Sequence, residues 1–149
     1  MHDLTATGGP ADQVLEDGIL QRVSPAMEVL WQWNSFDHML WTEMVYDHSE
    51  TEYAHLNSVA VDAQGNWIVS ARAFSQILKL DGVTGEVIWR LGGVSNDFEF
   101  INDPYGPCGQ HTASVLDNGT PIDIRQRAVV RPRVRRTRRA YSCGGVRIG

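Results

Sequence analysis

The chain has 149 residues, of which 42% are hydrophobic and 21% charged, a composition typical of one folded domain and not of a disordered chain. No stretch reaches the roughly 20 apolar residues of a membrane-spanning helix. The first residues have neither the basic nor the apolar region of a secretory signal. Two cysteines, Cys108 and Cys143, are too few for a disulfide scaffold or for a zinc site built from cysteines.

Charge is divided unevenly along the chain. The net charge of −5 combines −13 over residues 1–120, from 17 acidic and 4 basic side chains, with +8 over residues 121–149, from nine arginines and one acid. This division predicts an acidic globular part, residues 1–120, followed by a basic tail, residues 121–149.

Four short β-strands are predicted between residues 58 and 91. They are rich in Val, Ile and Trp, and clusters of Gly, Asn and Asp that are typical of turns separate them. No helical periodicity competes over a comparable length. An antiparallel meander is therefore expected, and one such sheet needs neighbouring sheets to cover its faces. The predicted strands are residues 58–61, 67–70, 76–80 and 87–91, with turns at 62–66 and 81–85.

An internal repeat predicts those neighbouring sheets. The segment Glu28–Gln32 recurs as Glu86–Arg90 at an offset of 58. Upstream, Leu20–Val23 matches Ile77–Leu80 at an offset of 57, because the turn in the first copy is one residue shorter.

A second match is independent of the first. The segment His55–Val59 recurs as His111–Val115 at an offset of 56, and both copies continue to a turn that contains Asp and Gly, at residues 62–65 and 117–119. A period of this length that carries four strands is typical of β-propeller blades. The sequence therefore predicts an all-β fold: a partial β-propeller of about two four-stranded antiparallel blades and the start of a third.

An arc of two blades leaves apolar surface uncovered, which predicts marginal stability or self-association through exposed blade edges. After residue 120 the repeat predicts another strand, but Pro121 and Pro132 discourage central strands, so an irregular tail is expected. Three interpretations of this Arg-rich tail stay open: a disordered solvated segment, a patch for nucleic acid or another anionic surface, or the product of a shifted reading frame. Nucleic acid is not expected as a partner.

Four polar residues are candidates for a functional site. His55, Asn57 and His111 stand where the first strand of a blade begins, and Arg72 follows the second strand. Equivalent positions of adjacent blades lie side by side around a propeller axis, and antiparallel pairing returns the end of the second strand to the start of the first. We therefore expect these residues to share a central funnel. Arginine and asparagine donors suit an oxyanion, and a neutral imidazole can act as nucleophile or general base.

These histidines have two alternatives to a catalytic role. Histidines at strand ends often only hydrogen-bond a neighbouring loop. The second alternative is metal binding. The sequence has no His-x-His or His-Glu-x-x-His spacing, and no carboxylate adjoins His55 or His111. Neither a metal nor a cofactor is therefore predicted. The Asp-His pairs at residues 37–38 and 47–48 are weak metal candidates.

The aromatic residues divide into two groups. Those at strand positions are predicted to pack between blades, and those in the segment before residue 50 are the better candidates for stacking on a ligand. The first group is Trp31, Trp33, Trp67 and Trp89, and the second is Trp41 and Tyr46.

Several segments are distinctive when taken together: His55-Leu-Asn-Ser-Val59, Asn66-Trp-Ile-Val-Ser-Ala-Arg72, Leu80–Gly93 and Gly109-Gln-His-Thr-Ala113. They resemble the arylsulfotransferase family of β-propeller enzymes, and Leu30–His38 is similar to that family's Trp-x-Ser-x-x-His segment. The resemblance covers roughly residues 3–120. Its specific part is the His-x-Asn-Ser, Ser-Ala-Arg and Gln-His combination, because quinoprotein propellers share the Asp-Gly-x-Thr-Gly-Glu pattern.

This resemblance implies transfer of a sulfuryl group from a phenolic sulfate ester to another phenol, through a sulfohistidine and without a nucleotide donor. It implies that His111 is the nucleophile and that His55 and Arg72 are catalytic, with Asn57 helping to bind the sulfuryl oxygens. An aryl sulfate and a phenol are then the small-molecule partners. Relatives are often exported, which leaves the compartment of this chain open.

The chain departs from the family pattern because the earlier His-His-Asp segment of many members is missing from it. We therefore expect an inactive fragment, truncated at both ends. The alternative is a non-catalytic propeller that binds a ligand or a protein. A quinone-dependent propeller is a third interpretation, but the sequence shows none of the cofactor contacts it needs.

Overall fold

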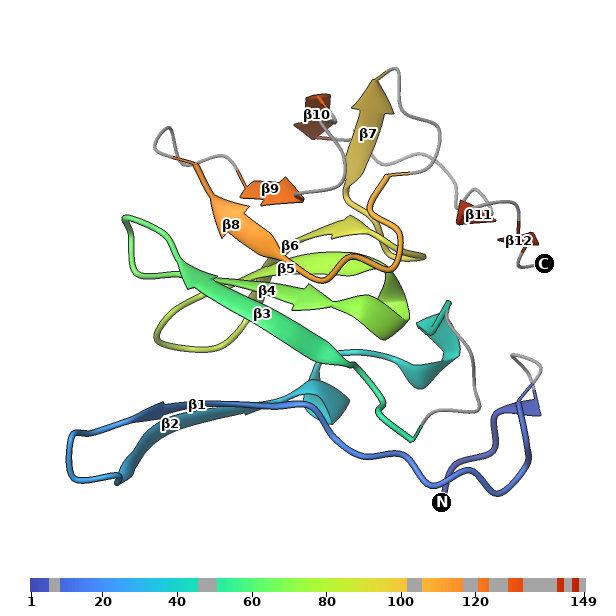
Figure 1. Ribbon diagram of the computed structural model, residues 1–149, viewed down its shortest axis with the longest axis horizontal. Helices are drawn as coiled ribbons and strands as arrows, with labels where there is room; N and C mark the ends of the chain where they lie inside the picture. The colour runs from blue at the N-terminus through green and yellow to red at the C-terminus, as the bar shows by residue number, and fades with distance from the viewer. Residues whose placement is uncertain are drawn as a thin grey trace.

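The computed structural model describes residues 1–5, 9–45, 51–101, 106–116, 121–123, 129–132, 142–143 and 146–147, the last four ranges by their backbone. The described chain is all-β, and its helical segments are short 3-10 turns (Figure 1). The strands are β1 (Ile19–Val23), β2 (Val29–Asn34), β3 (Leu56–Val61), β4 (Trp67–Ala71), β5 (Gln76–Leu80), β6 (Val87–Gly92), β7 (Phe98–Ile101), β8 (Ala113–Val115), β9 (Pro121–Asp123), β10 (Val129–Pro132), β11 (Ser142–Cys143) and β12 (Val146–Arg147). The 3-10 turns are η2 (Ser35–Asp37), η3 (Trp41–Glu43) and η4 (Arg72–Phe74).

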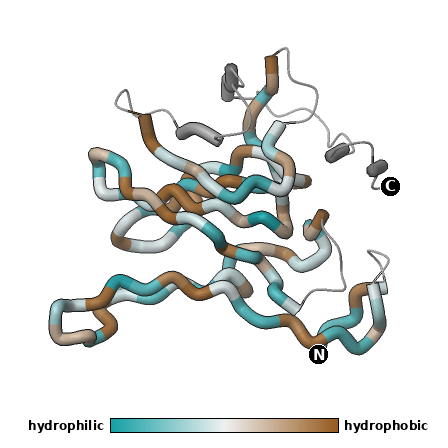
Figure 2. Tube along the Cα trace, viewed as in Figure 1, coloured by the Kyte–Doolittle hydropathy of each residue, from teal (hydrophilic) through white to brown (hydrophobic). Residues whose placement is uncertain are grey.

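The predicted meander is present as one antiparallel sheet with the strand order β3-β4-β5-β6. Successive side chains of a strand point to opposite faces, so alternation divides the apolar residues of β4 and β5 between two cores. Val69 and Leu78 belong to one core, and Ile68 and Ile77 to the other. Both faces of this central sheet are therefore apolar and need cover. Figure 2 shows the hydrophobic residues along the central strands.

Two half-sheets provide that cover on opposite faces of the central sheet (Figure 1). One half-sheet is the hairpin β1–β2, whose Trp33 packs into the same core as Val69 and Leu78. The other is the pair β8–β9, in which Ala113 joins the core that contains Ile68 and Ile77. The neighbouring sheets that the repeat predicted are thus found on both faces.

The hairpins β1–β2 and β5–β6 have the same pairing, residue by residue. Ile19 opposite Asn34 corresponds to Gln76 opposite Gly92, and every later pair corresponds in the same way. Even the register shift is repeated: it falls between Arg22 and Val23 in one hairpin and between Lys79 and Leu80 in the other. The sequence repeat is therefore a repeat of structure.

The half-sheet β8–β9 likewise matches β3–β4. Ser114 opposite Ile122 and Val115 opposite Pro121 correspond to Ser58 opposite Ser70 and Val59 opposite Val69. The predicted turn at residues 117–119 lies outside the described residues. One four-stranded sheet thus has a half-sheet on each side, and the described strands form two further pairs, β7–β10 and β11–β12.

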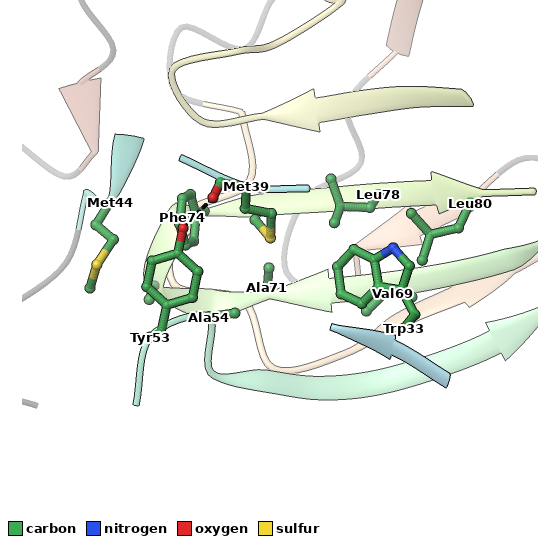
Figure 3. Packing of buried hydrophobic residues seen from close by; sticks show 11 residues of the cluster. Trp33, Met39, Met44, Tyr53, Ala54, Val69, Ala71, Phe74, Leu78 and Leu80 are labelled. Carbon is green, nitrogen blue, oxygen red and sulfur yellow. Dashed lines mark hydrogen bonds between the residues drawn. The ribbon is translucent and has the colours of Figure 1, made fainter. Parts of the chain in front are cut away.

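The larger core lies between the β1–β2 half-sheet and the central sheet (Figure 3). The Trp33 indole lies over β4 and β5, and its Nε1 donates a 3.1 Å hydrogen bond to the carbonyl of Gly85. The Tyr53 hydroxyl donates to the carbonyl of Met39, and the Tyr53 ring meets Phe74 edge-on at 5.4 Å. Burial, and then the charges of Asp17 and Glu43, raise the pKa of Tyr53, so it remains a neutral hydrogen-bond donor. The tryptophans predicted as packing residues are in these cores: Trp31, Trp33 and Trp67 in one, and Trp89 in the other.

The expectation of an irregular tail was wrong for the backbone described beyond residue 120. Strand β9 begins at Pro121 and pairs with β8, and β10, which ends at Pro132, pairs with β7. Proline lacks an N–H for the ladder, and strand ends are where it is tolerated. Both prolines stand at a strand end, which is why they do not prevent pairing.

Candidate functional site

His55 and Arg72 meet through their main chains, as antiparallel pairing predicts. His55 directly precedes β3, and its carbonyl accepts a 3.1 Å hydrogen bond from the N–H of Arg72, the first residue after β4. The backbone of His55 has a positive φ of 47°, a left-handed conformation that costs energy for a residue with a Cβ. The side chains of His55 and Arg72 are half-buried at this end of the central sheet.

The two histidines that the repeat predicted to be neighbours are neighbours in the structure. The ring centroids of His55 and His111 are 5.7 Å apart, and the rings meet edge-on at 71°. His111 stands two residues before β8 and is exposed, whereas His55 is half-buried. One imidazole is thus accessible to a small molecule while the other is held against the sheet.

Asn57 connects the two repeats. Its Nδ2 donates a 2.8 Å hydrogen bond to the carbonyl of Gln110, the residue before His111. Its Oδ1 is buried and has no hydrogen-bond partner among the described residues. Asn57 therefore fixes the segment that carries His111, and it retains an unused acceptor beside the histidines.

Gln110 is a residue of the site that the sequence analysis missed. Its side chain is fully buried, and its Nε2 donates to the carbonyl of Gln76 at 2.9 Å and to the Ser70 Oγ at 3.2 Å. The equivalent position in the first repeat is the apolar Ala54. This replacement of alanine by an amide, next to a repeated histidine, was the signal in the sequence that could have identified it.

Further contacts hold the chain on both sides of His111. The N–H of Gly109 donates to the Ser75 Oγ at 3.2 Å, and the N–H of Ala113 donates to the Ser58 Oγ at 2.8 Å. Cys108, just upstream, is disulfide-bonded. The segment from Gly109 to Ala113 is thereby fastened to the central sheet, so the His111 backbone has little freedom.

A carboxylate also contacts the site, although none adjoins either histidine in sequence. Glu52 Oε2 lies 2.5 Å from Nδ1 of His55. The segment that carries Glu52 is held by Glu16, whose N–H donates to the Thr51 carbonyl and whose own carbonyl accepts the N–H of Tyr53 at 3.0 Å. This contact brings a carboxylate oxygen to the Nδ1 side of the His55 ring and helps to set the orientation of that ring.

The other sequence candidates are placed elsewhere. The His38 ring stacks on Trp33 at 5.0 Å, and Trp41 packs against the core, so neither is arranged as a ligand site. Tyr46 and the Asp47–His48 pair lie outside the described residues. Within the described ranges, no three His, Cys, Asp or Glu side chains gather as a metal site would require. None of the described helical segments has the length and apolarity to cross a membrane.

The geometry can be compared with known proteins. No curated protein and no solved structure matches the chain. A family model described as arylsulfotransferase (ASST) matches residues 1–129, a range that includes His55, Asn57, Arg72 and His111. The match runs nine residues beyond residue 120, where the sequence analysis placed the end of the globular part. The chain therefore belongs to the arylsulfotransferase family.

Proposed function

We propose that this chain carries the histidine centre of an aryl sulfate sulfotransferase. The donor is a phenolic sulfate ester, and the acceptor is another phenol. In this proposal the central sheet and its half-sheets are successive blades of a β-propeller, with His55 and His111 at the end of the blades that faces the propeller axis. The observation that carries the proposal is the 5.7 Å separation of the two rings, which equivalent positions of successive repeats contribute.

The first half-reaction transfers the sulfuryl group to His111. A ring nitrogen of neutral His111 attacks sulfur, an N–S bond forms, and the bond from sulfur to the aryl oxygen breaks. The departing aryl oxide takes up a proton, for which His55 is the candidate donor. Negative charge on the sulfuryl oxygens is met by donors already in place, and we assign this role to Arg72 together with the second N–H of the Asn57 amide.

The second half-reaction restores the histidine. The oxygen of the acceptor phenol attacks sulfur, its proton passes to His55, and the N–S bond breaks. The contact between Glu52 and His55 supports this exchange, because a carboxylate against Nδ1 orients the His55 ring. The fastening of the segment from Gly109 to Ala113 supports it too, because attack on sulfur requires a fixed nucleophile.

The test is covalent labelling of the chain with 4-nitrophenyl sulfate. We expect release of one 4-nitrophenolate per active chain and a sulfuryl group on His111, located by mass spectrometry of peptides. His111→Asn should abolish both signals, and the control His2→Asn should retain both. Sulfation that persists in His111→Asn would remove His111 from the nucleophile's role. Labelling without onward transfer to phenol would identify a chain that holds the nucleophile but does not complete turnover.

A second candidate function is a propeller module that binds a ligand or protein without catalysis. The hydrogen bond from Asn57 to the Gln110 carbonyl favours it, because that bond gives the amide a structural task. Titration with inorganic sulfate and with phenyl sulfate, followed by the NMR shifts of the imidazoles, separates the two. Shifts at His55 and His111 with either anion support the anion site, and unchanged shifts support the non-catalytic module.

A further inference from the structure

The two half-sheets are complementary parts of one four-stranded sheet. By register, β1–β2 takes the place of β5–β6, and β8–β9 takes the place of β3–β4. In the central sheet these two hairpins are joined by the pairing of β4 with β5. Among the described strands, β1 pairs only with β2, and β9 pairs only with β8. The open edges of β1 and β9 are therefore equivalent to the two edges that pair with each other in the central sheet.

These two edges are separated within one copy of the chain. The half-sheets lie on opposite faces of the central sheet, which stands between them (Figure 1). Each half-sheet packs into a different core, through Trp33 on one side and Ala113 on the other. Pairing between β9 and β1 consequently requires a second copy.

We propose that β9 of one copy pairs antiparallel with β1 of a second copy, which completes a sheet of order β8-β9-β1-β2. The proposal rests on the repeat register and not on the proposed function. If β9 and β1 pair in the register of β4 and β5, three pairs of residues lie opposite each other in the new ladder. They are Pro121 with Gln21, Ile122 with Leu20, and Asp123 with Ile19.

Apolar surface and charge both favour this partner. Strand β1 exposes Ile19 by 51% and Val23 by 43%, whereas the equivalent Gln76 and Leu80 of β5 are buried, and a further strand beside β1 would cover part of this surface. The residues just before β1 include Asp12, Glu16 and Asp17 and no basic residue, whereas residues 121–140 hold eight arginines and one acid. Opposite charges on the two segments would favour association of two copies, and this attraction should weaken as salt is added.

The contact is heterologous, because it joins different edges of the two copies. Such contacts close into a ring if the rotation between copies permits and otherwise extend as a chain. Each copy adds two four-stranded sheets to the assembly, the central sheet and one completed from two halves. Propellers with four to eight blades are known, so rings of two to four copies are the closed forms that this rule allows.

The first experiment measures the molar mass of the 149-residue chain by light scattering during size-exclusion chromatography, over a range of concentration and salt. We expect multiples of the 16.6 kDa chain that dissociate as salt rises. Ile19→Lys places a charge on the β1 edge. Because natural edge strands use such charges to prevent pairing, this variant should weaken association about tenfold or more. Val83→Lys is the matched control at an equally apolar, 82% exposed residue in the β5–β6 turn, and should associate as the unmodified chain does.

The second experiment needs no variant and locates the contact directly. A mixture of two differently isotope-labelled copies should give intermolecular backbone NOEs between Ile122 and Leu20. A chain that is monomeric at all concentrations overturns the proposal. So does an oligomer without these NOEs, or one that Ile19→Lys leaves intact. Because the readout is mass and strand contact, the result stands whether or not the chain transfers a sulfuryl group.

Discussion

The hairpins β1–β2 and β5–β6 have the same register and the same shift in it, yet they differ in burial. All residues of β5 except Lys79 are buried, whereas all residues of β1 except Leu20 are exposed. Strand β5 lies between two strands and beneath neighbours on both faces, while β1 is an edge. The local sequence thus determines which residues pair, and the surrounding sheets determine which of them are buried.

The turns of the two hairpins show the same division. Ser24 and Asp81 both begin the turn, and each accepts hydrogen bonds from main-chain N–H groups two or more residues later. The left-handed position that follows is Met27 in one turn, with φ 63°, and Gly85 in the other, with φ 78°. The left-handed conformation is thus adopted both by glycine, which favours it, and by methionine, which does not.

The largest effect expected from this comparison is on core packing. Leu80 is fully buried, and its equivalent Val23 is 43% exposed. Leu80→Ala should lower the free energy of unfolding by ~2–5 kcal/mol, and Val23→Ala by less than ~1 kcal/mol, because only the first creates a cavity. Urea unfolding monitored by tryptophan fluorescence measures both. Equal losses would mean that the two hairpins are equally buried in solution.

A smaller difference is expected at the basic residues. Lys79 Nζ lies 2.6 Å from Oδ2 of buried Asp62, which also accepts the N–H groups of Gln64 and Asn66. Lys79→Met should cost ~1–3 kcal/mol by leaving this carboxylate without its cation, whereas the equivalent Arg22→Met, at an exposed site, should cost less than ~0.5 kcal/mol.

The pH dependence sharpens the same comparison. Burial opposes ionisation of Asp62, but the hydrogen bonds from Lys79, Asn66 and Gln64 outweigh it and lower its pKa to about 2. The folded-state pKa is below the ordinary value, so this stabilisation is present above about pH 4 and is lost as the pH falls toward 2. Lys79→Met should make stability less dependent on pH in this interval, and Arg22→Met should not. An unchanged dependence in Lys79→Met would contradict the assignment.

The smallest effects are expected at the turns, and they should have opposite signs. Met27→Gly relieves a left-handed residue and should stabilise the chain by ~0.5–1 kcal/mol. Gly85→Ala should destabilise by ~1 kcal/mol or more, because it adds strain and places a Cβ 3.1 Å from Cδ1 of Trp33. Thermal unfolding detects both, and a destabilised Met27→Gly variant would show that the turn of β1–β2 is held differently.

Much of the fold could be predicted because its signals are local. The four strands of the meander were placed to within two residues, since runs of Val and Ile end at turns such as Asp62–Asn66. The neighbouring position of His55 and His111 followed from the repeat together with the expected propeller geometry. Strand β7 was missed because its partner, β10, lies in the Arg-rich segment, where no local pattern indicates a strand.

The parts of the site that were missed depend on tertiary contacts. The bonds of Gln110 go to main-chain and hydroxyl groups more than 30 residues away, and no local pattern predicts them. Glu52 is only three residues from His55, but their contact depends on how the chain turns at Ala54 and at the left-handed His55. Repeats predict which residues are equivalent; they do not predict where one copy acquires a buried amide in place of an alanine.

The shared register shift has a consequence for how such chains can change. A hairpin whose geometry is encoded within its own two strands is an interchangeable part, which duplication can insert without redesign of its pairing. Its outward-facing side chains are then free to diverge, toward a core in one setting and toward solvent or a partner in another. In this molecule the pairing of a hairpin and the burial of its side chains can therefore change independently of each other.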